Sequence, residues 1–273
     1  MYITNKTDIA QIAESAGVDR IFVDMEYIGK AERQGGMDTV QSHHTVEDVR
    51  RIRAAVETAE VLVRVNPVHD ATADYCSTEE EIDSVISAGA DIIMLPFIKS
   101  AEEVRRFIRA VDGRAGNMLL IETPQAVEAI DEILDIEGID ELYIGLNDLS
   151  LGYGKKFMFE LLADGTVEKL CLKFKLKQIP YGFGGIASIG KGLLPGECVI
   201  REHYRLGSTC SILSRSFCNV NKEKHIGVIS STFINGVRDI RRLEYECEGY
   251  ARYFRENEQK VAEIVRHIGE VGE

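Results

Sequence analysis

The sequence predicts a (β/α)8 barrel, an α/β fold in which eight parallel strands alternate with helices. Short runs rich in Ile, Val, Leu, Phe and Tyr recur up to about residue 217, and most lack the alternation of a half-exposed strand. Segments with helical periodicity lie between them. Strands that are buried on both faces and alternate with helices are typical of a parallel sheet covered by helices. A length of 273 residues suits one such barrel.

The expected strands lie at residues 2–4, 20–25, 61–66, 91–97, 117–123, 141–148, 179–187 and 210–217. Expected helices include residues 8–17, 45–57, 78–89, 100–111 and 123–134. Thr caps, terminal glycines and Pro124 in a first turn support these helices. The alternative, a doubly wound open sheet, would need a phosphate or dinucleotide fingerprint after the first strand, and MYITNKTD contains none.

The chain is helical in pattern from about residue 220 to its end, which is more helix than one barrel position needs. Extra C-terminal helices either form oligomer contacts or pack against the barrel base. There is no internal repeat, low-complexity tract or linker. We therefore expect one domain over residues 1–273, in which residues 221–273 form a helical extension used in homo-oligomer contacts.

Charge and cysteine usage restrict the function. A formal net charge of −13 argues against nucleic acid or an anionic membrane as the main partner, although a local cluster of arginines and a metal can still receive an anionic substrate. The six cysteines show no metal-ligand spacing, and three of them lie in or beside apolar stretches, so we expect small buried side chains in a reducing compartment. The sequence has no signal-peptide core and no apolar run of about 18 residues, so we expect a cytoplasmic protein.

Two carboxylates are expected at the C-terminal ends of consecutive strands, Glu122 in LLIETP and Asp148 in YIGLNDLS. Neighbouring strands lie about 4.8 Å apart, so two such acids can hold one small cation. Mg²⁺ takes one or two carboxylates together with waters and substrate oxygens. The pair indicates a metal site for an anionic, oxygen-rich substrate. The alternative is that both acids only cap the helices that follow.

Other polar or small residues are expected at the same strand ends, where barrel enzymes place their chemistry. They are Asp24, Glu26, Tyr27, Arg64, Asn66, Pro96, Gly184, Gly185 and Arg215. Arg64 interrupts an apolar strand, so it needs either a substrate oxyanion or an internal salt bridge to Asp24 or Glu26. Gly184 and Gly185 either offer N–H groups to an anion, with Arg215 facing it, or satisfy a packing requirement.

The loop after the second expected strand contains Lys30, His43 and His44. Such a loop could fold over the cleft and deliver a general base. The alternative is a solvent-facing segment just before a helix.

Five motifs in order, DMEYIGKAER, VLVRVNP, GADIIMLPF, LLIETPQAV and IGLNDLS, resemble the HpcH/HpaI aldolase and citrate lyase β-subunit family of the phosphoenolpyruvate/pyruvate barrel superfamily. The resemblance runs from about residue 8 to residue 150. It implies a (β/α)8 barrel that forms dimers or higher oligomers, with Mg²⁺ or Mn²⁺ bound by Glu122 and Asp148. It also implies that Arg64 contacts the keto acid and its enolate, and that Asp24 and Glu26 form the acidic motif.

The chain departs from the family pattern at the expected base. The aldolase branch has a histidine where this chain has Tyr27, and the aspartate that pairs with that histidine falls on Ser87. Proton transfer would then fall to Tyr27, Glu26, His43, His44 or water. We assign substrate binding to Asp24, Asn66, Pro96, Gly184, Gly185 and Arg215.

The leading hypothesis is a divalent-metal-dependent carbon–carbon lyase that acts through an enolate of pyruvate or a related 2-keto acid. One alternative is a phosphoenolpyruvate-linked transferase or mutase that holds phosphate at Gly184, Gly185 and Arg215. The other is a non-catalytic binding or assembly protein that has lost its base.

Overall fold

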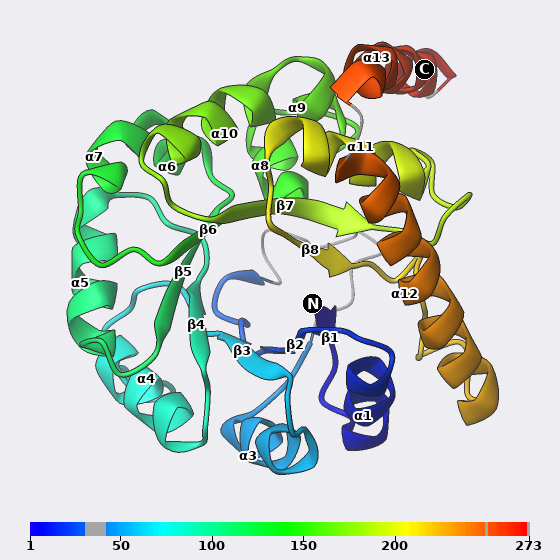
Figure 1. Ribbon diagram of the computed structural model, residues 1–273. Coiled ribbons are helices and arrows are strands. Elements are labelled where there is room, and N and C mark those ends of the chain that lie inside the picture. Colours follow the sequence, from blue (N-terminus) through cyan, green and yellow to red (C-terminus); the bar gives the residue numbers. More distant parts are fainter. Residues whose placement is uncertain (31–41, 249–250, 272–273) are drawn as a thin grey trace. The chain divides into compact units, whose positions relative to one another are not determined.

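Eight strands pair in sequence order as a closed barrel in the computed structural model, which confirms the predicted (β/α)8 fold class (Figure 1). The structure describes residues 1–30, 42–248 and 251–271. These residues group into two compact units, the first formed by Met1–Glu14 with Val18–Leu142 and the second by Ser15–Gly17 with Tyr143–Glu273. The two units are described in turn.

All eight predicted strands are present, and each ends earlier than predicted. They are β1 Tyr2–Ile3, β2 Arg20–Asp24, β3 Glu60–Arg64, β4 Ile92–Leu95, β5 Gly116–Ile121, β6 Glu141–Ile144, β7 Tyr181–Ile186 and β8 Cys210–Leu213. The differences are largest at β6 and β8, and at β6 helix α8 begins at Leu146 and places Asp148 in its first turn instead of on a strand. Most candidate site residues therefore lie in the loops that follow the strands.

Helices surround the strands of the first unit. They are α1 Thr7–Ser15, α3 Val46–Ala55, α4 Thr78–Ser87, α5 Ala101–Val111, α6 Pro124–Glu128 and α7 Ile130–Leu134. Helices α3, α4 and α5 lie outside strands β2 to β5 (Figure 1). Fully buried residues on these strands, such as Val63, Ile93 and Leu119, form the core.

The predicted helix starts are largely correct. Thr45 caps α3 with a reciprocal capping box to Asp48. Helix α4 is capped by Ser77, one residue before the predicted start. The single helix predicted over residues 123–134 is wrong: the chain forms two short helices that meet at Ala129, whose ψ of 7° is not helical.

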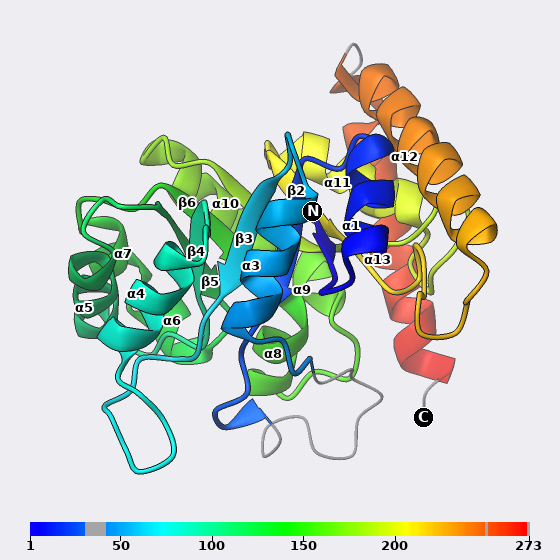
Figure 2. The same ribbon diagram turned by 90° about the horizontal axis from the view of Figure 1, so that it is seen from below.

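The second unit contains the predicted C-terminal helices. Its elements besides the strands are α8 Leu146–Gly152, α9 Glu160–Ala163, α10 Thr166–Leu176, α11 Gly196–Leu206, α12 Ile226–Glu248, a 3₁₀ turn Ala251–Tyr253 and α13 Phe254–Val271. Both α12 and α13 pack against α11, and two views show α12 beside it (Figures 1 and 2). Asn257 of α13 donates to the Cys198 carbonyl at 3.0 Å and to Glu202 at 2.8 Å on α11. The use of these helices in an oligomer stays a prediction.

All six cysteines are free thiols. Four are buried, Cys171, Cys198, Cys218 and Cys247, whereas Cys76 is exposed and Cys210 is half-buried, so the expectation of burial is wrong for these two. Within the described ranges, no helix is both long and apolar enough to cross a membrane.

His203 is a buried, neutral histidine in the second unit. Its ring stacks on Phe183 with centroids 3.9 Å apart, and Nδ1 lies 2.7 Å from Ser208 Oγ. Its Nε2 has no hydrogen-bond partner among the described residues. Burial lowers the pKa of His203 to about 3 because water cannot solvate the imidazolium.

We predict that His203 makes the fold acid-sensitive below pH 6.5. At pH values between the ordinary histidine pKa and about 3, His203 binds a proton in the unfolded chain but not in the folded protein. The free energy of unfolding therefore falls as the pH falls. Lowering the pH from about 6.5 to about 4.5 should cost about 1–3 kcal/mol through this residue. Urea unfolding of wild type and His203→Leu at both pH values measures the difference. Equal pH dependence in the two proteins would contradict the assignment.

Candidate active site

Asp24 and Arg64 form a bidentate ion pair at the ends of two adjacent strands. The parallel register of β2 and β3 places the two residues opposite each other. Arg64 donates from Nε to Asp24 Oδ1 and from Nη2 to Asp24 Oδ2, both at 2.8 Å. The guanidinium carbon also lies 5.6 Å from the centroid of the Phe22 ring. Arg64 therefore has one of its expected partners, an internal carboxylate.

Lys30 and Glu26 complete a charge quartet with Asp24 and Arg64. Lys30 Nζ lies 2.9 Å from Asp24 Oδ2 and 3.4 Å from Glu26 Oε2. Arg64 Nη1 lies 3.4 Å from the same Glu26 oxygen. Asp24, Glu26 and Lys30 are buried, and 14% of the Arg64 side chain is exposed. Two cations therefore compensate two anions where water is largely excluded.

The charge quartet keeps its central pair ionised. Burial alone would raise the pKa of Asp24, but Arg64 and then Lys30 outweigh it and hold that pKa well below its usual range. Burial alone would lower the pKa of Arg64, but Asp24 and Glu26 outweigh it and raise that pKa, with a smaller contribution from Glu122. Arg64 is therefore a permanent cation in the site.

Asn66 fixes the backbone of the loop that follows β2. Its Oδ1 accepts hydrogen bonds from the amides of Tyr27 and Ile28, both at 3.0 Å. Its Nδ2 donates to Glu81 Oε1 of helix α4 at 2.8 Å. The Tyr27 ring is 42% exposed, and its centroid lies 5.5 Å from that of Tyr75. Asn66 thus holds the segment that carries Glu26 and Tyr27.

Glu122 is held in place just beyond β5. Its side chain is buried, and Oε1 accepts a hydrogen bond from the Phe97 amide at 2.9 Å. Phe97 follows the buried Pro96 and adopts a φ of 50°, which is rare for a residue with a side chain. The loop after β4 therefore adopts a strained conformation at the point where it binds this carboxylate.

The two histidines differ in environment. His43 is exposed, and His44 is half-buried with Nδ1 accepting a hydrogen bond from the Asp24 amide at 3.0 Å. Burial lowers the pKa of His44, although Asp24 and Asp48 oppose the shift. Because Nδ1 is the acceptor, the proton of neutral His44 is on Nε2. His44 therefore offers a hydrogen-bond donor at Nε2.

The remaining candidates lie in the second unit. Gly184 has a φ of 59°, and a Cβ there would lie 2.8 Å from the Leu146 side chain. Packing and backbone conformation therefore already require glycine at position 184, whereas a Cβ at Gly185 would meet only ordinary contacts. Arg215 is exposed, and Asp148 is half-buried in the first turn of α8.

The structure thus brings Asp24, Glu26 and Arg64 into direct contact and connects Tyr27, Asn66 and His44 to the same strand ends. Sequence reasoning gave no role to Lys30 and did not name Glu81. The spacing of Lys30 four residues after Glu26 was a usable signal, since a short turn can bring such a pair together. Glu81 sits in an acidic run, TEEE, whose members look alike in sequence.

Comparisons with known proteins show which family the sequence resembles. Residues 2–159 match the model of the HpcH/HpaI aldolase/citrate lyase family. A hydroxypyruvate/pyruvate aldolase of Roseovarius nubinhibens is 26% identical over 145 residues, which cover 42% of this chain and 55% of that protein. A 2-keto-3-deoxy-L-rhamnonate aldolase of Escherichia coli is 24% identical over 176 residues, 54% of this chain and 58% of that protein. The matches thus span little more than half of these relatives.

Solved structures share the fold. An HpcH/HpaI aldolase from Desulfitobacterium hafniense superposes with a TM-score of 0.59 at 18% identity, covering 88% of this chain and 91% of that one. The citrate synthase SbnG superposes with a TM-score of 0.57 at 15% identity, covering 89% and 92%. At these identities the likeness concerns the fold alone.

We predict that Lys30 is needed for stability. Lys30→Met removes one cation and leaves two buried carboxylates with Arg64 alone, so the free energy of unfolding should fall by about 3 kcal/mol. Urea denaturation at neutral pH measures the change. The control is Lys169→Met, at an exposed position on α10, which should change stability by no more than about 0.5 kcal/mol. Equal effects of the two substitutions would refute the buried ion-pair role of Lys30.

Proposed function

Because the chain belongs to the HpcH/HpaI aldolase/citrate lyase family, we propose that it is a carbon–carbon lyase acting through the enolate of pyruvate or a related 2-keto acid. The observation that carries the proposal is the Asp24–Arg64 pair, which holds a largely buried guanidinium at the C-terminal ends of β2 and β3. A fixed cation at this position suits a substrate that is already anionic and gains charge on a carbonyl oxygen.

Arg64 has further N–H groups that can donate hydrogen bonds to such a substrate. A guanidinium carries five N–H groups in a planar fork, and Asp24 uses one on Nε and one on Nη2. Among the described residues, the other carboxylate paired with Arg64 is that of Glu26, whose Oε2 lies 3.4 Å from Nη1 and is too far for a strong hydrogen bond. The Nη1 edge can therefore bind a carboxylate or carbonyl oxygen while Asp24 keeps the other edge in place.

We propose that Glu122 and Asp148 hold Mg²⁺ or Mn²⁺. Both offer carboxylate oxygens, the donors these ions prefer, and Glu122 is oriented by the Phe97 amide. Among the described residues no three His, Cys, Asp or Glu side chains form a metal cluster. Mg²⁺ needs only one or two carboxylates, because water and substrate fill its other positions. When bound, the cation would polarise the substrate carbonyl as a Lewis acid.

Two of the candidate proton-transfer groups suit donation. His44 carries its proton on Nε2, and its lowered pKa keeps the ring neutral. Burial, followed by the charge of Glu81, raises the pKa of Tyr27, so its phenol stays protonated at neutral pH. We propose that both donate hydrogen bonds to the substrate, and that the proton is taken up by Glu26, His43 or water.

Exchange of the pyruvate methyl protons in D2O tests the proposal, because an enzyme that forms the metal-bound enolate catalyses it in a metal-dependent manner. We expect exchange that depends on Mg²⁺ or Mn²⁺. Arg64→Met should slow the exchange by about 100-fold or more through loss of charge stabilisation. Glu122→Gln should weaken metal binding, so that exchange needs a higher metal concentration. Proton NMR follows the methyl signal.

The control is Glu102→Gln, which removes an exposed carboxylate paired with Arg105 and Arg109 and should exchange at the wild-type rate. Wild-type exchange in Arg64→Met would contradict the role of the guanidinium. Failure of the wild type to exchange any 2-keto acid would contradict the proposed function.

A further inference from the structure

Helix α4 reaches the candidate active site through one buried carboxylate, that of Glu81. Its side chain accepts hydrogen bonds from Asn66, from Nδ2 at 2.8 Å and from the backbone amide at 3.2 Å. Asn66 in turn holds the amides of Tyr27 and Ile28. We propose that Glu81 is a positioning residue that acts on the reaction through Asn66. The kinetic part of this inference rests on the proposed function.

The Asn66 side chain is oriented by the loop amides on one side and by Glu81 on the other. Its Oδ1 is occupied by the two loop amides, and its Nδ2 by Glu81. Asn66 is 1% exposed, so water cannot replace a lost partner at low cost. Without the Glu81 carboxylate, the amide group can rotate and release the Tyr27 and Ile28 amides.

Burial of the Glu81 carboxylate on this face of helix α4 is energetically unfavourable. It is 5% exposed and lies beside the apolar Ile82 and Val85, which are fully buried. Burial raises its pKa, and the hydrogen bonds from Asn66 offset the shift only in part. An apolar residue would fill this position at lower cost, so its charge is explained by what it orients.

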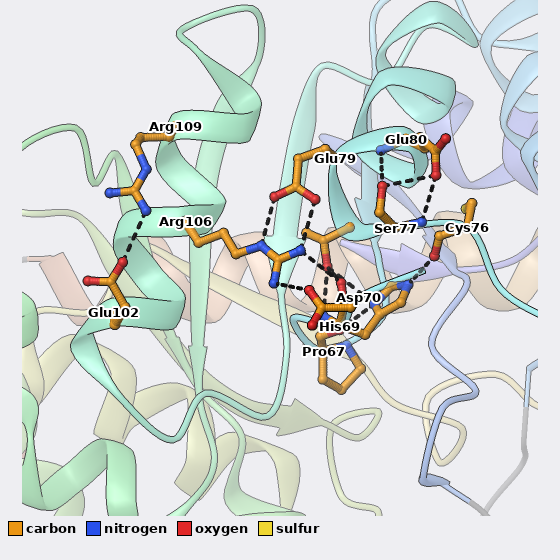
Figure 3. A network of polar contacts seen from close by, with 11 residues as sticks. Pro67, His69, Asp70, Cys76, Ser77, Glu79, Glu80, Glu102, Arg106 and Arg109 are labelled. Atoms are coloured by element: carbon orange, nitrogen blue, oxygen red, sulfur yellow. Dashed lines mark hydrogen bonds and ion pairs between the residues drawn. The ribbon is translucent and has the colours of Figure 1, made fainter. Parts of the chain in front are cut away.

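The beginning of α4 is itself anchored. Arg106 of α5 binds both oxygens of Glu79, together with Asp70 and the His69 carbonyl (Figure 3). The His69 ring lies 2.7 Å from the Pro67 carbonyl and 2.8 Å from the Cys76 carbonyl, so it bridges the two ends of the loop before α4. Glu81 therefore extends from a rigid support.

A reciprocal exchange of the two side chains tests the proposal. In the double variant Glu81→Gln/Asn66→Asp, the amide and the carboxylate change places. The side-chain amide now on α4 can then donate to the carboxylate now beyond β3, that carboxylate can still accept from the Tyr27 and Ile28 amides, and the net charge is unchanged. Asn66→Asp alone brings two carboxylates together and breaks the pair. Glu81→Gln alone keeps one oxygen for Asn66 Nδ2 but places an N–H donor beside the Asn66 backbone amide, so it weakens the pair.

The first readout is hydrogen exchange of the Tyr27 and Ile28 amides, which requires no activity. Each single variant should raise their exchange rate about tenfold, and the double variant should restore most of the protection. The second readout is kcat/KM for the keto acid. Each single variant should lower it, and the double variant should restore most of it. Glu102→Gln, whose exposed carboxylate binds Arg109, is the matched control (Figure 3).

Three outcomes would overturn the proposal. An Asn66→Asp variant that leaves the two amides protected, or a double variant no better than this single variant, would contradict the proposal that Glu81 acts through Asn66. If hydrogen exchange became equally faster in strands β3 and β4, Glu81 would act only on the stability of the fold. If wild type turned over no keto acid, the proposed function would fail, while hydrogen exchange would still decide the role of Glu81.

Discussion

The bidentate pair between Asp24 and Arg64 is the interaction on which the candidate site depends. It arises from strand register, since the two residues are opposed on neighbouring parallel strands. Lys30 and Glu26 then surround the pair, so charges that would be costly alone become mutually compensated. The result is a cation whose position is set by the barrel and not by a flexible surface side chain.

Polar contacts beyond the strand ends position the other groups. Each strand stops one or more residues before the sequence pattern predicts, and residues beyond the strand ends form polar contacts with neighbouring loops and helices. Asn66 holds the loop after β2, and the Phe97 amide holds Glu122. The barrel supplies the frame, and these side-chain-to-backbone bonds give the loops a defined conformation.

Sequence reasoning anticipated the contacts of Arg64 with Asp24 and Glu26 from charged residues that lie in or end apolar strands. Arg64 stands out because a charge interrupts an apolar strand, and Asp24 and Glu26 stand out because they end one. Lys30 and Glu81 could not be assigned this way. Lys30 lies in a polar loop and Glu81 in a run of glutamates, so their burial depends on tertiary contacts that no local pattern encodes. The boundary between α6 and α7 was missed because a continuous helical period runs across it.

The most direct test of the account is ¹⁵N NMR of the Arg64 guanidinium during titration with pyruvate, with the signals assigned by comparison with Arg64→Lys. The account predicts that the Nε–H signal, bound to Asp24, stays protected and nearly unshifted while the Nη signals move on binding. Loss of the Nε–H signal on binding would show that the substrate displaces Asp24. Unchanged Nη signals at saturating pyruvate would show that Arg64 does not bind the keto acid, and would contradict the central claim.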